Sequence, residues 1–192
     1  DRAQALNAEV VAGPFHQPLG VFSGSSPTEQ EKAWAVEVHR RASDLAGQAG
    51  ITLAVEFLNR FECYFLNTMN DAAAYARRVN HPSFGVLYDT FHANIEEKDP
   101  VGVIAPNIDT IKYVHISEND RGTPGTGHID WRGTFKALRS AGYDGCLTIE
   151  AFSRALPGLA AATRVWRDFF TSQEDVYTQG YKFIRQQWDQ AK

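Results

Sequence analysis

Short runs of β-branched and aromatic residues recur along this chain at intervals of roughly thirty residues. The clearest runs start 33, 27 and 34 positions apart and cover residues 51–55, 84–88, 111–116 and 145–149. A weaker run covers residues 9–12. Such runs are typical of buried strands, and this spacing leaves room for the crossover that connects parallel strands. The repeat therefore predicts an α/β fold built from βα units around a parallel sheet.

Capped amphipathic segments lie between these runs, where βα units require helices. An N-cap Ser26, a proline suited to the first helical position and Glu29 three residues after the cap predict a helix that ends near Gly50. Its apolar residues at three- and four-residue spacing predict a buried stripe of Trp34, Val38, Ala42, Leu45 and Ala49. Further helices are predicted from residue 70 or 71 to 79, at 99–100, from 130 to 141, from 159 to 170 and from about 172 to 190.

Each of the four clear runs ends beside a side chain that can bind a metal ion. In chain order, these side chains are Glu56, Asp89, His115 and Glu150. Because ligands bind at the carboxyl ends of parallel strands, we expect all four to meet at one edge of the sheet. Three carboxylates and one imidazole suit Mn²⁺, Mg²⁺ or Co²⁺ better than a thiolate-bound structural zinc. The pattern predicts an open catalytic metal site.

A single carboxylate at a strand end has a simpler explanation as a helix N-cap or a salt-bridge partner. Four in register are harder to explain in that way. The runs before them are apolar, so the acids are expected to be partly buried, and a buried carboxylate needs a cation or an arginine beside it.

More polar side chains lie in the loops just beyond the strand ends. Glu62, His92 and Arg121 combine hydrogen-bond donors and acceptors, which suits a polyhydroxylated ligand, although solvated loop charges are the alternative. The segment 122–127 is rich in glycine but has neither phosphate-loop spacing nor a helix directly after it. We interpret this segment as a shaped loop near the site.

Composition narrows the class of protein. The 192 residues, 43% of them apolar, are enough for one folded domain. A net charge of −4 argues against nucleic acid as the main partner, and no stretch approaches the ~18 apolar residues of a membrane span. Cys63 and Cys146 are too few for a disulfide framework, which favours a reducing, cytoplasmic setting.

Four segments together resemble the ketose 3-epimerases, the D-tagatose and D-allulose 3-epimerase group of the xylose-isomerase-like sugar isomerases and epimerases. They are VEFLNRFE (55–62), DTFHANIEE (89–97), HISENDR (115–121) and TIE (148–150). The resemblance implies a (β/α)₈ TIM barrel with one divalent metal ion, Mn²⁺ first and Co²⁺ or Mg²⁺ as alternatives. The implied metal ligands are Glu56, Asp89, His115 and Glu150, and the implied sugar contacts are Glu62, His92 and Arg121.

The implied reaction is C3 epimerisation of a free ketose such as D-tagatose, D-fructose or L-ribulose. With the metal ion as a Lewis acid, one of the catalytic residues Glu56 and Glu150 removes the C3 proton to give an enediolate. The other returns a proton on the opposite face. Hydroxypyruvate isomerase and keto-inositol dehydratase are alternatives with the same architecture, whereas an endonuclease-IV-like enzyme needs more histidine ligands and a basic face.

The length of the chain is short for this fold. A TIM barrel needs about 250 residues and eight βα units, whereas the five runs fit the fourth to eighth units. We therefore expect residues 1–192 to form a single domain, the C-terminal portion of such a barrel. A homo-oligomer or a chain that completes the barrel is the expected partner, and an inactive partial barrel that binds sugar or pairs with another chain is the alternative function.

Overall fold

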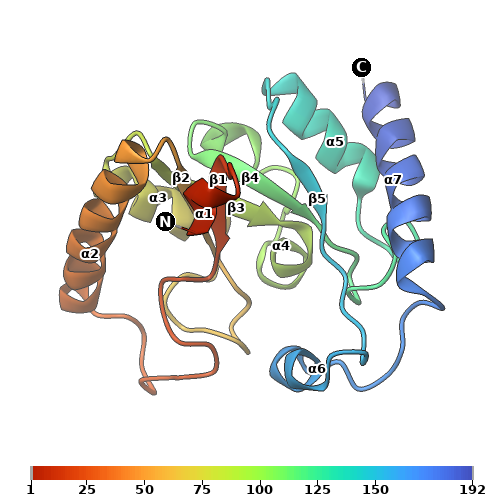
Figure 1. Ribbon diagram of the computed structural model, residues 1–192, viewed down its shortest axis with the longest axis horizontal. Helices are drawn as coiled ribbons and strands as arrows, with labels where there is room; N and C mark the ends of the chain where they lie inside the picture. The colour runs from red at the N-terminus through yellow and green to blue at the C-terminus, as the bar shows by residue number, and fades with distance from the viewer. Residues whose placement is uncertain (1, 192) are drawn as a thin grey trace. The chain divides into compact units, whose positions relative to one another are not determined.

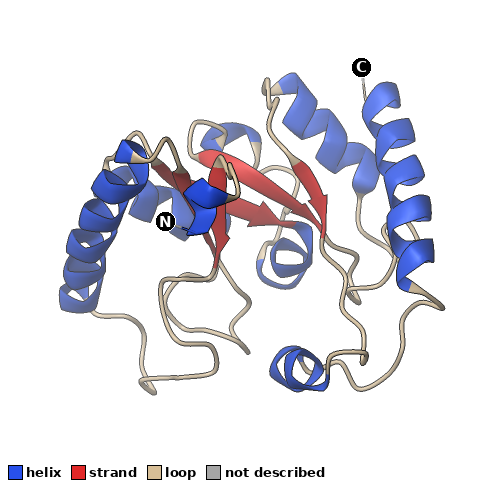
Figure 2. Cartoon of the chain, in the orientation of Figure 1, coloured by secondary structure: helices blue, strands red, loops and turns tan. Residues whose placement is uncertain are grey.

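A computed structural model describes residues 2–191, in which five strands form one sheet in the order β1-β2-β3-β4-β5 (Figure 1). The chain divides into two compact units. The first unit extends to Tyr88 and includes Asn107–Tyr113, and the second contains Asp89–Pro106 and everything from Val114 onward. The predicted α/β architecture is confirmed, because helices alternate with strands along the chain (Figure 2).

The first unit begins the series of parallel strands. Its elements are α1 (Arg2–Ala5), β1 (Val10–Gly13), α2 (Glu29–Gln48), β2 (Thr52–Glu56), α3 (Met69–Val79) and β3 (Phe84–Asp89), whose last residue belongs to the second unit. Strand β1 pairs in parallel with β2, with Val10 opposite Thr52, and β2 pairs in parallel with β3, with Leu53 opposite Phe84. The weak run at residues 9–12 is therefore a strand, displaced by one residue from its expected position.

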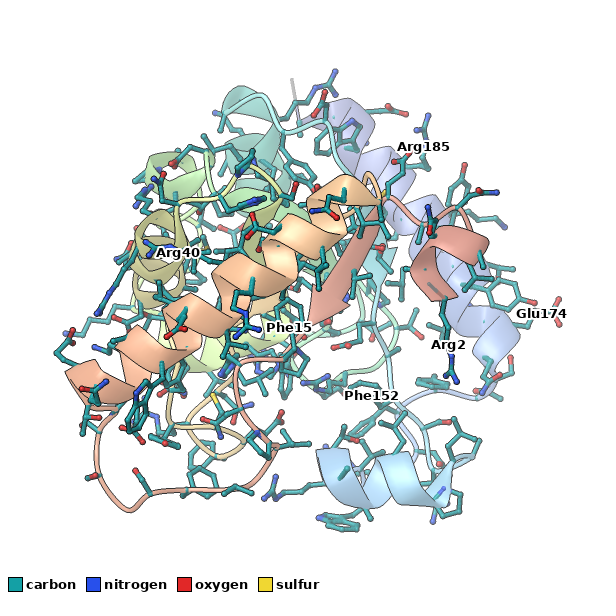
Figure 3. All side chains as sticks on the ribbon, turned by 60° about the vertical axis from the view of Figure 1, so that its left-hand side comes forward. Arg2, Phe15, Arg40, Phe152, Glu174 and Arg185 are labelled. Carbon is teal, nitrogen blue, oxygen red and sulfur yellow. The ribbon has the colours of Figure 1, made fainter. Side chains whose placement is uncertain are left out.

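A buried histidine organises the core of the first unit. The His39 ring lies among aromatic rings, stacked on Phe84 with the ring centroids 5.3 Å apart and edge-on to Phe15, which Figure 3 places beside α2. Its Nδ1 lies 2.5 Å from the Tyr75 hydroxyl. Burial lowers the pKa of His39, so the ring is held in its neutral form and packs as part of the core.

The N-terminus of α2 corrects one prediction. The N-cap is Thr28 and not Ser26, and Thr28 forms a capping box with Glu31. The Glu31 amide donates to the Thr28 hydroxyl at 3.1 Å, and the Thr28 amide donates to the Glu31 carboxylate at 2.7 Å. The helix therefore begins two residues later than the serine-proline signal indicates.

The buried face of α2 corrects a second prediction. Trp34, Val38 and Leu45 are 60%, 62% and 69% exposed, whereas the inward residues are Val36, His39 and Ser43. Polar contacts set this rotation, because the buried Ser43 hydroxyl donates to the His39 carbonyl and Arg40 donates to carbonyls at the end of α3 (Figure 3). Spacing alone finds a stripe, but it does not determine which stripe faces the sheet.

The second unit carries the remaining elements. They are α4 (Thr90–Glu96), most of the short 3-10 turn η1 (Ala105–Asn107), the end of β4 (Ile111–Ile116), α5 (Trp131–Ser140), β5 (Leu147–Ile149), α6 (Pro157–Thr163) and α7 (Gln173–Gln190). Strand β4 pairs in parallel with β5, with Val114 opposite Leu147. Helices α5 and α7 lie side by side (Figure 1), joined by edge-on contacts of Trp131 with Phe183 and of Phe135 with Trp188.

Three predictions of local structure in the second unit are corrected, one of a loop and two of helices. Helix α4 begins directly after β3, in a segment expected to be a loop. Residues 99–100 form a turn, in which the Gly102 amide donates to the Asp99 carboxylate, and not a helix. Helix α6 ends at Thr163, far short of residue 170. The last helix, α7, lies at the predicted position, with Ser172 as its N-cap.

Two further observations concern membrane-spanning helices and the state of the cysteines. Within residues 2–191, no helix is long and apolar enough to cross a membrane. Cys63 is buried, Cys146 is exposed, and both are free thiols.

Candidate metal centre

The four predicted ligands stand at the strand ends, as the sequence indicates. Glu56 and Asp89 are the last residues of β2 and β3, His115 is the next-to-last residue of β4, and Glu150 directly follows β5. Asp89 is fully buried and Glu56 is 4% exposed. The carboxyl ends of the strands thus collect one imidazole and three carboxylates.

Asp89 uses its two carboxylate oxygens differently. Oδ1 accepts a hydrogen bond of 2.6 Å from the Phe91 amide, which makes Asp89 the N-cap of α4. Oδ2 accepts from the Ser117 hydroxyl at 3.1 Å and lies 3.3 Å from Nδ1 of His115. The capping explanation is therefore correct for one oxygen and leaves the other available to a ligand.

His115 lies between two carboxylates. Its Nδ1 is 3.3 Å from Asp89 Oδ2 and 3.4 Å from Glu150 Oε1. Neighbouring ligand atoms around a cation with bonds of about 2.1 Å are about 3.0–3.5 Å apart. The separations fit one divalent ion bound by these three side chains, and the oxygen-rich donor set fits Mn²⁺, Mg²⁺ or Co²⁺.

Arg121 lies against the other oxygen of Glu150. Its Nη1 donates to Glu150 Oε2 at 2.7 Å, and its Nη2 is 2.9 Å from Nε2 of His92. The guanidinium lies between two rings, 4.1 Å from the centroid of Phe91 and 4.5 Å from that of Phe152, which Figure 3 labels. Arg121 is only 4% exposed, so most of its bonding capacity faces protein groups.

The charges of these groups follow from burial and from each other. Burial opposes the charge of Asp89, but the bond from His115 and the nearby Arg121 hold the pKa of that carboxyl well below its usual range. Burial, together with the positive charge of Arg121, lowers the pKa of His92 to about 3, although the Asp89 carboxylate acts in the opposite direction. His92 is therefore neutral near pH 7, and its Nε2 accepts the hydrogen bond from Arg121.

Glu56 and Glu62 belong to the first unit. Glu62 lies in the loop after β2, 7% exposed, where its Oε1 accepts from the Asn59 side chain at 3.1 Å. Glu56 is one of four residues whose ligand atoms lie within 4.8 Å of one another, and the other three are Asp89, His115 and Glu150. All four predicted ligands are therefore candidates for one ion.

Sequence reasoning missed the residues that support this centre. Ser117 bonds to Asp89, and the Thr90 hydroxyl ties the ends of β3 and β4 together by accepting from the Ser117 amide. Phe91 and Phe152 enclose Arg121. The proximity of Ser117 and Phe91 to predicted site residues is a usable signal, but no sequence pattern joins Phe152 to Arg121.

The family is established by comparison with known proteins. Residues 1–187 match the family described as xylose isomerase-like TIM barrel, and this chain belongs to that family. The predicted (β/α)₈ fold class is thereby confirmed, with five of its strands in this chain.

Curated relatives include sugar epimerases. A protein named ketose 3-epimerase from Arthrobacter globiformis is 38% identical over 193 residues, covering 96% of this chain and 66% of the relative. A probable ketose 3-epimerase from Synechocystis sp. is 36% identical over 176 residues, covering 92% of this chain and 61% of the relative. The chain thus spans a little under two thirds of the length of these relatives.

Solved structures agree with this placement. A structure of L-ribulose 3-epimerase superposes with a TM-score of 0.93 at 32% identity, covering 98% of this chain and 64% of that one. A D-allulose 3-epimerase from Methylomonas sp. in complex with D-allulose has a TM-score of 0.91 at 32% identity, covering 96% of this chain and 65% of that one. The resemblance to ketose 3-epimerases predicted from the sequence is confirmed.

Proposed function

We propose that this chain carries the metal centre of a divalent-metal-dependent ketose 3-epimerase that acts on a free ketose. The observation that carries the proposal is the position of His115, whose Nδ1 faces carboxylate oxygens of Asp89 and Glu150 at distances suited to shared metal ligation. Relatives named ketose 3-epimerase, and a related structure described as a complex with D-allulose, point to the same chemistry.

The proposed ligands of the ion are Glu56, Asp89, His115 and Glu150. The proximity of their ligand atoms supports this assignment. Mn²⁺ is the proposed ion, with Co²⁺ and Mg²⁺ as alternatives, because the donor set is hard and rich in oxygen. When bound, the cation supplies Lewis acidity to the ketose oxygens and so favours loss of the C3 proton.

Glu150 is proposed as one of the two acid–base residues. Arg121 fixes the orientation of its carboxylate by donating to Oε2, which retains a second lone pair for the C3 proton. Transfer of that proton to Oε2 leaves the substrate as an enediolate. Glu56 is proposed to carry a proton at the start and to deliver it to C3 on the opposite face, which inverts the configuration. Glu150 is then protonated and Glu56 ionised, and proton exchange with water restores the starting state.

Sugar binding is assigned to Glu62, His92 and Arg121. The neutral His92 and the acidic Glu62 offer the mixed donors and acceptors that hydroxyl groups need. Because Arg121 is buried and bonded to Glu150, we assign it a smaller part in sugar affinity than the sequence suggests. The ketose is the proposed partner, and a cytoplasmic location is proposed because both cysteines are free.

A test of the reaction uses the chain with Mn²⁺ and a panel of ketoses in deuterated water. We expect deuterium at C3 and a C3-epimeric product, resolved by chromatography and NMR, for at least one ketose. Hydroxypyruvate and a keto-inositol belong in the panel, because turnover of either one alone would replace the epimerase proposal with an alternative. Metal binding without exchange into any ketose would contradict the proposed activity.

We also propose that the chain acts together with further barrel units, supplied by a second copy or by another chain. The support is that β1 and β5 end the sheet, whereas a TIM barrel closes its sheet, and that the chain spans 61% and 66% of the two curated relatives. Analytical ultracentrifugation should reveal a homo-oligomer. A strictly monomeric chain with full turnover would contradict this part of the proposal.

A further inference from the structure

Glu118 is a buried carboxylate that the proposed reaction does not use. It is fully buried, two residues beyond the end of β4. Its oxygens accept hydrogen bonds of 2.8–3.3 Å from the amides of Asn119, Gly125 and Ile129 and from the indole of Trp131. Burial raises the pKa of Glu118, but these N–H donors outweigh burial, so the net direction is downward.

The glycine-rich loop is built around this carboxylate. Gly125 has φ of +92°, a conformation that favours glycine, and its amide donates to Glu118 at 2.8 Å. At Gly127, an added Cβ would lie 2.6 Å from Glu118 Oε1 and closer still to the Asn119 side chain. The loop is thus lined with N–H groups as an anion-binding loop is, but its anion is a side chain of the protein itself.

Glu118 also holds the backbone of Arg121. The Arg121 amide donates to the Glu118 carbonyl at 2.9 Å, and the Arg121 carbonyl accepts from the Phe152 amide at 3.0 Å. Arg121 has φ of 62°, in the left-handed region that residues other than glycine adopt only when their surroundings enforce it. The conformation that brings the guanidinium to Glu150 therefore depends on both ends of this turn.

We propose that Glu118 is a positioning residue for proton transfer at C3, and that it acts through Arg121. The buried carboxylate locks the loop after β4, the locked loop holds Arg121 in its left-handed conformation, and Arg121 orients Glu150. This inference rests on the proposed epimerase function. The Glu118 carboxylate bonds to amides of the loop after β4 and to Trp131, and the Glu118 carbonyl bonds to the Arg121 amide.

The kinetic test compares Glu118→Gln with two other variants in the Mn²⁺-loaded protein. Glu118→Gln turns part of the side chain into an N–H donor that faces other N–H donors. Gly127→Ala places a Cβ against the side chains of Asn119 and Glu118 and so displaces the carboxylate. In both, we expect kcat to fall by about 10- to 100-fold while KM changes by less than about threefold. Asp130→Ala is the control, because it removes a nearby carboxylate that caps α5 by accepting from the Gly133 amide.

A double-mutant cycle tests the route through Arg121. If Glu118 acts through Arg121, Glu118→Gln should lower kcat by less than about twofold when Arg121→Ala is already present. If Glu118→Gln lowers kcat as much in the Arg121→Ala background as in the wild type, the proposal is overturned. The proposal would also be overturned if Glu118→Gln and Asp130→Ala, compared at equal stability, had the same kcat.

A spectroscopic readout separates this inference from the proposed function. In the folded chain, the Arg121 side-chain N–H signals should exchange slowly and be shifted by the rings of Phe91 and Phe152. In Glu118→Gln they should broaden or move toward solvent values, while Asp130→Ala leaves them in place. The epimerase proposal fails if the wild-type chain has no turnover. The positioning role fails if the Arg121 signals of Glu118→Gln are the same as those of the wild type.

Discussion

Asp89 combines two roles that usually occur in different residues. One oxygen caps α4 through the Phe91 amide, and the other faces His115 and the Ser117 hydroxyl. The cap fixes the rotation of the carboxylate, and the Ser117 hydroxyl holds Oδ2 in the same orientation. A helix that begins immediately after a strand therefore orients a ligand at the strand end.

The proposed acid–base role of Glu150 can be tested directly by one substitution. Glu150→Gln removes the proposed base but keeps its size and one oxygen, so exchange of the C3 proton should fall at least about a thousandfold. The variant should still bind some metal through the other three ligands, as isothermal titration calorimetry can measure.

The matched control for Glu150→Gln is Asp168→Asn. Asp168 is an exposed carboxylate that pairs with Arg154, so its loss should leave exchange unchanged. Normal turnover by Glu150→Gln would show that the acid–base assignment is wrong.

Among the elements, α2 shows how polar contacts override apolar spacing. The stripe of Trp34, Val38 and Leu45 has helical periodicity, yet it faces outward. The observed rotation of the helix places the buried His39 against the Tyr75 hydroxyl, so that both polar groups have a partner, and it brings the exposed Arg40 to the carbonyls at the end of α3. A helix with two usable faces cannot be oriented from its own sequence, because the choice depends on what α3 presents to it.

The start of α2 gives a stability prediction. Thr28→Ala removes the hydroxyl that accepts from the Glu31 amide and keeps the backbone amide that donates to the Glu31 carboxylate, so the free energy of unfolding should fall by about 1 kcal/mol in urea titrations. Ser26→Ala is the paired control, because Ser26 is exposed and lies outside the helix, and its effect should stay within about 0.5 kcal/mol. The reverse order of the two effects would restore Ser26 as the cap.

For the molecule as a whole, buried neutral histidines link stability to pH. Burial lowers the pKa of His16 to about 4, against a weaker opposing effect from the Glu56 backbone. Between pH 6.5 and 4 the unfolded chain binds a proton at His16 that the folded chain does not, so stability decreases as pH falls. His16 alone should remove about 2 kcal/mol between pH 7 and pH 5.

The measurement is chemical denaturation of the wild type and His16→Gln at both pH values. The variant should lose less stability on acidification than the wild type does. Equal losses in the two proteins would contradict the assignment of a buried, neutral His16.

Metal binding gives a second prediction at this scale. With Mn²⁺ at about 100 times its Kd, the free energy of unfolding should rise by about 2.7 kcal/mol. Asp89→Asn should lose most of this increase, whereas Asp109→Asn, which changes an exposed partner of Arg77, should keep it. Equal stabilisation of both variants in metal-dependent unfolding would remove Asp89 from the ligand set. Parallel titrations with Co²⁺ and Mg²⁺ rank the ions.

Much of the site was predictable because its residues lie at regular places in the repeat. Glu56, Asp89 and Glu150 each follow an apolar run, and a parallel sheet carries such residues to one edge. Contacts between side chains that are far apart in the sequence were not predictable. The guanidinium of Arg121, predicted to contact sugar, also bonds to Glu150 and lies against the ring of Phe152, contacts that form only when two loops distant in the sequence meet.

The sequence by itself determined the class of fold, the positions of the strands and the types of side chain at their ends, because these depend on local periodicity and on short motifs. Only the tertiary structure decided which face of α2 is buried, which oxygen of Asp89 caps a helix, and why glycine stands at positions 125 and 127. Those outcomes depend on contacts between residues far apart in the chain. In the last case the partner is Glu118, whose buried charge must be met by N–H groups.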